Sequence, residues 1–157
     1  MKMFIGGTWV DGGAGQMPVT DPTTGEAFDT VPLGGAAEAD LAIAAAAAAF
    51  AAWKSVPMVE RVRLQKSCAE AIRAAAPEVA ALLSRELGRP LAGCFQEITR
   101  SAELLEIYAE EGLRLQATMS LGAAKGERTI VTRDPVGVVV AITPFNYPIT
   151  LLMFKLG

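Results

Sequence analysis

The chain has 157 residues, of which 52% are apolar and 20% are charged, with a net charge of -3 and no histidine. Its length and composition suffice for one folded core. The slight acidic excess argues against nucleic acid as a partner, and the lack of histidine excludes Ser-His-Asp triads, Cys-His pairs and histidine-containing zinc sites.

Residues 1–35 are rich in Gly, Pro, Asp and Thr, and turn formers separate their short apolar pieces. This composition predicts short edge strands joined by turns. Because the first residues contain no apolar stretch long enough for a signal peptide, we expect the protein in the cytoplasm. Residues 37–53 are dominated by alanine, the best helix former, and predict a helix that a neighbour can approach closely.

Three further helices are predicted before the first strong strand. They begin at Pro57, Pro77 and Pro90, because proline is favoured in a first turn, and the second ends at Gly88 and the third at Gly112. Their inward stripes are expected to contain Val59, Val62, Leu64, Cys68, Ala71 and Ile72; then Val79, Leu82 and Leu83; then Phe95, Ile98, Ala102, Leu105 and Tyr108 or Ala109.

Cysteines and glutamates on these helices have structural interpretations. Cys68 and Cys94 lack the close spacing of metal sites and are expected to be small buried thiols in a reducing compartment. Glu103, Glu106 and Glu110 share one helical face, but no histidine is present to complete a di-metal site, so they predict a solvated face. The sequence therefore predicts no metal centre.

Residues 115–135 contain two β-favouring arms around the glycine-containing segment 122–126. A two-stranded ribbon is marginal alone in water, so we expect it to lie against another surface, such as a second subunit. The glycine clusters at 12–15 and 122–126 lack the spacing of a phosphate-binding loop and predict turns.

Residues 135–154 form an uncharged run that is long enough to cross a membrane as one helix. Pro144 and Pro148 would each break such a helix, and the valines at 138–140 favour a strand. We therefore predict no membrane span, but a buried strand, a proline-bracketed turn that presents Asn146, and a short helix. An amide at the carboxyl end of an interior strand can hydrogen-bond a reacting group, although a lone asparagine is more commonly a turn residue.

Five segments resemble, in the same order, the amino-terminal part of the NAD(P)-dependent aldehyde dehydrogenases: residues 4–10, 21–26, 51–53, 86–90 and 134–148. The last of these, DPVGVVVAITPFNYP, is the most specific. The resemblance implies an α/β fold. Residues 1–114 would supply strands and helices of the cofactor-binding domain, residues 115–135 an oligomerisation ribbon, and residues 136–157 the first strand, the turn and the helix start of a Rossmann-like core, with the catalytic domain beyond them.

The resemblance also implies roles for particular residues. Asn146 matches the family amide that stabilises the oxyanion when a cysteine thiolate attacks an aldehyde. The family residues along the nicotinamide riboside of NAD or NADP correspond to Ile142, Thr143, Pro144 and Phe145.

The family's nucleophilic cysteine and general-base glutamate belong to segments beyond residue 157. Neither Cys68 nor Cys94 matches the nucleophile, so the chain alone is expected to be inactive. Three functions remain open: oxidation of a small aldehyde to an acid by a full-length homo-oligomer, a CoA-acylating semialdehyde dehydrogenase, or a non-catalytic fragment that associates with a full-length subunit through the ribbon.

Overall fold

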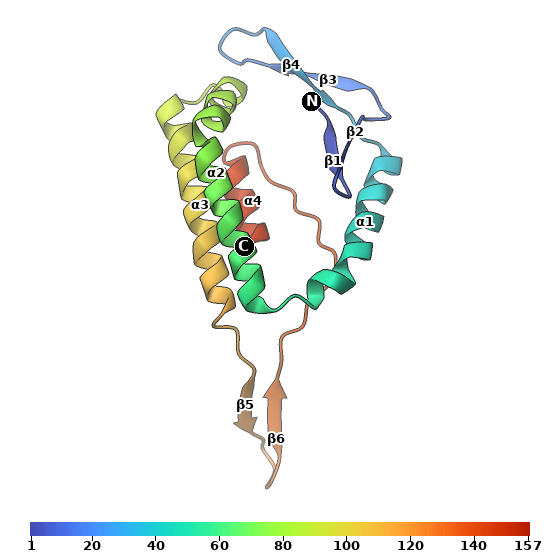
Figure 1. Ribbon diagram of the computed structural model, residues 1–157, viewed down its shortest axis with the longest axis vertical. Helices are drawn as coiled ribbons and strands as arrows, with labels where there is room; N and C mark the ends of the chain where they lie inside the picture. The colour runs from blue at the N-terminus through green and yellow to red at the C-terminus, as the bar shows by residue number, and fades with distance from the viewer.

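The structure is a computed structural model that describes residues 1–157. It is an α/β arrangement, as expected, with four helices and three separate two-stranded antiparallel sheets (Figure 1). The elements in chain order are β1 (Met3–Ile5), β2 (Thr8–Val10), β3 (Gln16–Thr20), β4 (Ala27–Pro32), α1 (Ala36–Lys54), α2 (Met58–Leu87), α3 (Leu91–Gly112), β5 (Thr118–Leu121), β6 (Arg128–Val131) and α4 (Pro148–Leu156).

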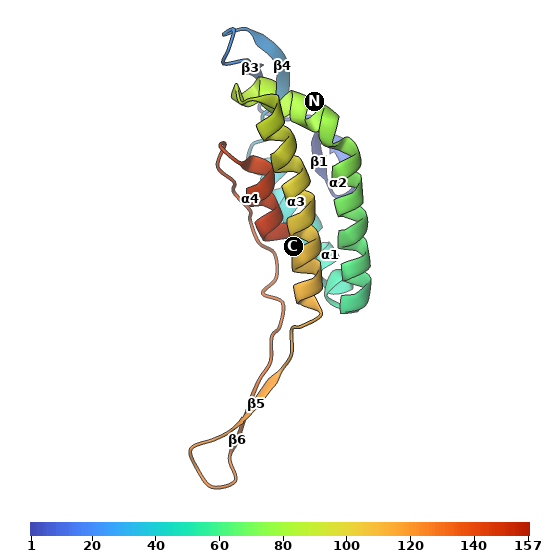
Figure 2. The same ribbon diagram turned by 90° about the vertical axis from the view of Figure 1, so that its left-hand side faces the viewer.

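The core lies between α2 and α3, which run side by side, and α4 packs against them (Figures 1 and 2). Small residues let the helices approach closely, and large ones fill the remaining space. One cluster joins Ala76, Ala80, Leu83, Cys94 and Ile98, and a second joins Ala69, Ala102, Leu105 and Met153. Met153 is the buried residue of α4, and Ile149 and Leu152 of the same helix pack against these clusters.

Residues 58–87 form one helix rather than the two that were predicted, with Pro77 inside it. A proline removes one backbone donor and pushes on the preceding turn, which bends a helix without necessarily ending it. Figure 2 shows the axis of α2 turning over its last third. Burial of Ala76, Ala80 and Leu83 against α3 offsets this local cost. Three long helices, not four, therefore precede the ribbon.

The predicted inward stripes are partly correct on both helices, because Phe95 on α3 is 42% exposed. Ile98, Ala102, Leu105 and Ala109 are buried on α3. On α2, Val59 is 72% exposed and Leu64 is 42% exposed, whereas Val62 is buried. Several inward positions of α2 are occupied by alanine. Because alanine is also common on exposed helix faces, the sequence pattern did not distinguish the buried face of this helix.

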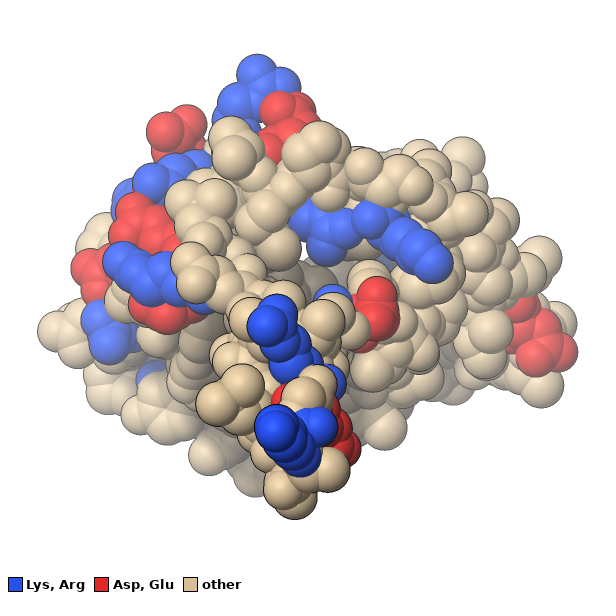
Figure 3. All heavy atoms as spheres, turned by 90° about the horizontal axis from the view of Figure 1, so that it is seen from below, with Lys and Arg blue, Asp and Glu red and all other residues tan.

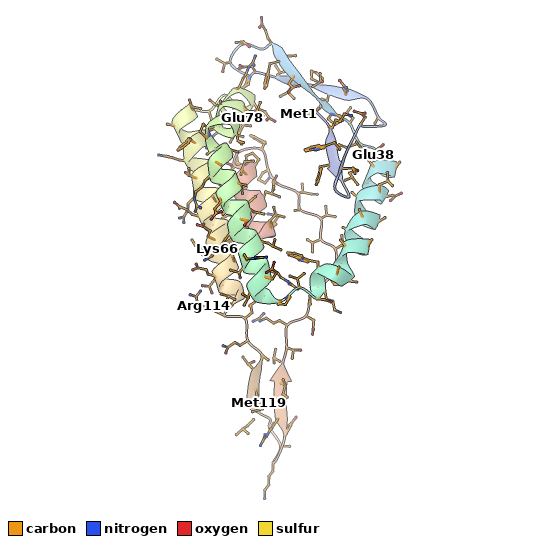
Figure 4. All side chains as sticks on the ribbon, in the orientation of Figure 1. Met1, Glu38, Lys66, Glu78, Arg114 and Met119 are labelled. Carbon is orange, nitrogen blue, oxygen red and sulfur yellow. The ribbon has the colours of Figure 1, made fainter.

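Side-chain hydrogen bonds anchor helix α1 at its two ends. At its start, Glu38 (Figure 4) accepts hydrogen bonds from the backbone N–H groups of Gly35, at 2.6 Å, and Gly13, at 3.1 Å. At its end, Arg61 donates to the carbonyls of Trp53 and Lys54, both at 3.0 Å. No residue of α1 is buried.

By length and composition alone α1 could cross a membrane, whereas the uncharged run at 135–154 is not a continuous helix.

The hairpin β3–β4 lies over the junction between α2 and α3 (Figure 1). The guanidinium carbon of Arg85 lies 4.1 Å from the centre of the Phe28 ring, and Arg85 Nε lies 3.6 Å from a carboxylate oxygen of Asp21. Gly88 ends α2 with a left-handed φ of 66°, the conformation that glycine adopts without strain. These contacts hold the end of α2 against the hairpin.

The ribbon of β5 and β6 projects away from the helices (Figures 1 and 2). All eight of its strand residues are exposed, including Met119 (Figure 4). Viewed from the ribbon end, the surface carries acidic and basic groups among uncharged areas (Figure 3). The two predicted arms are therefore present, at Thr118–Leu121 and Arg128–Val131.

The predicted strand at 136–142 does not form, and residues 132–147 run without helix or strand from β6 to α4. Val136, Val140 and Ile142 are 91%, 72% and 82% exposed. A strand needs a hydrogen-bonded neighbour, and the chain offers none beside this segment. The β-forming composition of the segment was identified correctly, but its burial was not.

Candidate functional site

Asn146 lies in the turn that immediately precedes α4. Pro148 occupies the first turn of α4, where its fixed φ suits a helix and its missing N–H costs nothing. The Asn146 side of this turn is tied to the α2–α3 junction, because Arg89 Nη1 donates to the Asn146 carbonyl at 2.9 Å. The Arg89 guanidinium carbon also lies 4.3 Å from the centre of the Tyr147 ring. One arginine therefore contacts two successive residues of the turn.

Glu97 is the buried charge beneath this turn. Its side chain is 0% exposed, and its Oε2 accepts a hydrogen bond from Arg89 Nη1 at 2.5 Å. Its Oε1 accepts from the backbone N–H groups of Ile149, at 3.1 Å, and Thr150, at 3.4 Å. The first N–H groups of a helix have no partner within that helix, and a carboxylate beside them also favours the helix dipole. Glu97 on α3 therefore caps α4.

Two hydroxyl groups extend the contact by one turn. Ser101 lies one turn after Glu97 on the buried face of α3, and its Oγ donates to the Glu97 carbonyl at 2.7 Å. The hydroxyls of Ser101 and Thr150 lie 3.1 Å apart. Because both helices contribute side chains and backbone to the contact, the start of α4 is fixed in position and direction.

The electrostatics of the site follow from this pairing. The hydrogen bond to Glu97 raises the pKa of the Arg89 guanidinium, which therefore stays charged. Burial raises the pKa of the nearby Cys94 thiol, although the Arg89 charge opposes that shift. Cys94 is accordingly a neutral thiol within the core rather than a nucleophile. A cavity of about 310 Å³ borders Arg89, Glu97, Arg100 and Tyr147.

The predicted site residues are consecutive but are not gathered into a pocket by the chain itself. Ile142 and Phe145 are 82% and 81% exposed, Pro144 and Asn146 are exposed, and Thr143 is partly buried. They form an accessible, mostly apolar stretch that ends at the amide. Their predicted contacts with a cofactor remain predictions.

Sequence reasoning missed Glu97 and Arg89 as a pair. The available signal was the position of Glu97 beside Ile98 and one turn before Ser101, next to the residues of α3 that were predicted to face inward. A carboxylate on such a stripe needs a partner, because burying an unpaired charge is costly. Its partner could not be inferred, since it lies across the helix junction.

The predicted solvated glutamate face is largely confirmed, because the side chains of Glu103 and Glu110 are 54% and 52% exposed and that of Glu106 is 31% exposed. Glu106 accepts hydrogen bonds from Arg73, and Glu110 accepts one from Lys66 (Figure 4) at 2.9 Å, so both link α3 to α2. Only Glu103 pairs within its own helix, with Arg100 at 3.0 Å. The cysteines differ likewise: Cys94 is buried as predicted, whereas Cys68 is exposed.

Known proteins resemble the whole chain. The model of the aldehyde dehydrogenase family matches residues 9–157. Glutarate-semialdehyde dehydrogenase of Pseudomonas putida is 37% identical and the match covers 99% of this chain and 33% of that protein. The NADP(+) succinate-semialdehyde dehydrogenase GabD of Escherichia coli is 35% identical, with coverage of 99% and 33%.

Solved structures give the same result. The NADP-dependent glyceraldehyde-3-phosphate dehydrogenase of Bacillus halodurans, solved with NADP, superposes with a TM-score of 0.92 at 31% identity. That superposition covers 98% of this chain and 34% of that one. A succinate-semialdehyde dehydrogenase from Burkholderia pseudomallei also gives a TM-score of 0.92, at 36% identity, with coverage of 98% and 32%. The chain thus spans about a third of the length of the curated relatives it matches.

Proposed function

The chain belongs to the aldehyde dehydrogenase family, and we propose that it is the amino-terminal third of an NAD(P)-dependent aldehyde dehydrogenase. The observation that carries this proposal is the superposition of nearly the whole chain on a dehydrogenase solved with NADP. Coverage of about a third of each relative supports a segment of a longer protein.

In the proposed enzyme, Asn146 acts as a hydrogen-bond donor to the reacting aldehyde. As a cysteine thiolate from a later segment adds to the carbonyl carbon, the oxygen gains negative charge. The Asn146 amide donates to that oxygen more strongly as the charge develops. A fixed donor of this kind is typically worth about 3 to 4 kcal/mol in the transition state.

The segment before Asn146 fits one wall of a nicotinamide site. NAD(P)+ accepts the hydride when it is bound. Ile142 and Phe145 are apolar and exposed, so they are free to contact a ring and a ribose, and Thr143 adds a hydroxyl. We infer that residues 142–145 orient the cofactor and exclude water on this side.

The relatives suggest a substrate class. Their names specify succinate semialdehyde, glutarate semialdehyde, glyceraldehyde 3-phosphate and 3-sulfolactaldehyde. Each of these aldehydes carries an anionic group. We propose that the full-length protein oxidises a small aldehyde with a carboxylate or similar anion at its other end.

The ribbon of β5 and β6 is proposed to contact a second subunit of a homo-oligomer. Its exposed Leu121, Ile130 and Val131 would lose contact with water there.

Both cysteines are free thiols, which agrees with the proposed cytoplasmic location.

A direct test measures NADH or NADPH formation by the full-length protein that carries this segment. Succinate and glutarate semialdehydes should be oxidised faster than uncharged aldehydes of equal length. Asn146→Ala should lower kcat by about 100- to 1,000-fold. Gln96→Ala, which removes an exposed amide from α3, is the matched control and should leave kcat unchanged. Unchanged kcat in Asn146→Ala would refute the assigned role, and a requirement for CoA would indicate the acylating alternative.

The 157-residue chain should be inactive alone. We propose this because neither Cys68 nor Cys94 matches the family nucleophile. The same assay on purified chain, free of contaminating dehydrogenases, checks it. Reduction of NAD+ or NADP+ that depends on aldehyde would overturn the proposal that the remaining parts of the catalytic site lie elsewhere.

A further inference from the structure

We propose that Glu97 is a positioning residue for the Asn146 amide. It acts through Arg89 and through the first turn of α4, and it does not touch the substrate. The inference rests on the proposed function of Asn146 as an oxyanion donor. It adds that the position of this donor is set by a buried carboxylate on a different helix.

The geometry closes a ring of hydrogen bonds around Asn146. One oxygen of Glu97 binds Arg89, and the same Arg89 nitrogen, Nη1, donates to the Asn146 carbonyl. The other oxygen binds the N–H groups of Ile149 and Thr150, three and four residues further along the chain. The backbone of Asn146 is thus held on both sides by contacts that meet at one carboxylate.

The burial of Glu97 separates it from the other ion pairs. Arg73 with Glu106 and Lys66 with Glu110 also link α2 to α3, but their side chains are 31 to 52% exposed. Glu97 is 0% exposed. A buried ion pair frequently adds little net stability compared with apolar packing, although it can fix one geometry. Here the ion pair of Arg89 with Glu97 fixes the geometry of the turn that contains Asn146.

The proposal predicts a loss in the chemical step. An oxyanion donor acts only at the correct distance from the developing charge, and a displacement of about 1 Å can cost about 100-fold in rate. Glu97→Gln keeps the shape and one acceptor but turns a donor toward Arg89. It should lower kcat about 10- to 100-fold with little change in KM.

The decisive experiment is a double-mutant cycle in the full-length protein. Glu97→Gln should lower kcat in the wild-type background but have almost no further effect in Asn146→Ala. Arg89→Lys, which retains the charge but loses the forked donor, serves as a second variant in case Glu97→Gln does not fold. Glu106→Gln is the matched control, because it breaks an ion pair between α2 and α3 that does not contact the turn. The proposal would be overturned by additive losses in the double mutant, or by an unchanged kcat in both Glu97→Gln and Arg89→Lys.

A second readout does not depend on activity. Hydrogen–deuterium exchange of the peptide 145–152 should be faster in Glu97→Gln than in wild type and unchanged in Glu106→Gln. If the wild-type protein oxidises no aldehyde, the proposed function fails and the catalytic role of Glu97 fails with it. Exchange that is unchanged in an active protein would instead refute the positioning role alone.

Discussion

The two cysteines have opposite environments, although both lie on the paired helices α2 and α3. Cys68 faces solvent, whereas Cys94 is 0% exposed within the cluster of Ala76, Ala80 and Ile98. Alkylation requires an accessible thiolate, and burial raises the pKa of the Cys94 thiol.

We expect iodoacetamide at pH 8 to modify Cys68 rapidly and to spare Cys94 until the protein unfolds. Peptide mass spectrometry over time measures both rates. Cys68→Ser should leave no rapidly labelled site, and adding urea should expose Cys94. Equal labelling of the two cysteines in native buffer would show that the α2–α3 core is open.

Local backbone features were predicted well. The proline-bracketed turn that contains Asn146 is present, whereas the role of its amide was assigned from the family resemblance and stays a prediction. Glu97 was missed because its function depends on Arg89 and on two N–H groups that are more than fifty residues away in the chain. A single charged residue on an apolar stripe indicates that a partner exists, but the sequence does not identify it.

Among the elements, the junction of α2 and α3 depends on Gly88. Its φ of 66° is strained for other residues, and a Cβ there would lie 2.9 Å from Pro22 Cγ on the β3–β4 side. Gly88→Ala should lower the free energy of unfolding by about 1 to 2 kcal/mol, measured by urea denaturation.

Gly93 provides the matched control, because it lies inside α3 and an added Cβ would meet only Arg89 Nη2, at 4.0 Å. Gly93→Ala should be neutral or stabilising by up to about 1 kcal/mol, since alanine favours the helix. If both substitutions destabilise equally, the left-handed cap is not the cause.

The ion pair of Arg73 with Glu106 links α2 and α3 and should make their association sensitive to acid. The hydrogen bond from Arg73 lowers the pKa of Glu106 below its usual 4.5. A carboxyl whose folded-state pKa is lowered contributes its full stability above the unfolded pKa and loses it as pH falls through the folded pKa.

Glu106→Gln should therefore be less stable than wild type at pH 7, and the difference should shrink as pH falls below about 4.5, the usual pKa of the group. Thermal unfolding followed by circular dichroism from pH 7 to pH 3 measures it. Glu103→Gln, whose partner Arg100 is on the same helix, should show little difference at any pH. A difference for Glu106→Gln that is constant with pH would contradict this account.

The boundaries of most elements could be predicted because they carry local signals. Such signals are the glycine at 88, the proline at 90 and the alanine-rich segment at 36–54. Helices α1 and α3 closely match their predicted ranges. Pro77 misled the prediction because tertiary packing, not local preference, decided whether the helix continued. The same is true of residues 136–142, whose strand preference has no partner to satisfy it.

At the scale of the whole molecule, only 13 of 157 residues are buried, which is few for a chain that is 52% apolar. Val136, Ile142 and Phe145 lie more than 80% exposed along one segment. Exposed apolar surface of this extent favours association in water.

We expect the purified 157-residue chain to self-associate and to bind the dye ANS, as measured by sedimentation velocity and fluorescence. The proposed full-length protein should bind much less dye, because its further segments would cover this surface. A monodisperse chain that melts cooperatively and binds no dye would show that residues 1–157 form a self-sufficient domain.

The projecting ribbon has a consequence for how the chain tolerates change in length. Residues 113–147 leave the helix pair and return to it, and only then does α4 reach Glu97. For such a tether, doubling the number of residues adds only about 0.6 kcal/mol of closure entropy. Insertions at the tip, around residues 122–126, should therefore leave the contact between α4 and Glu97 intact.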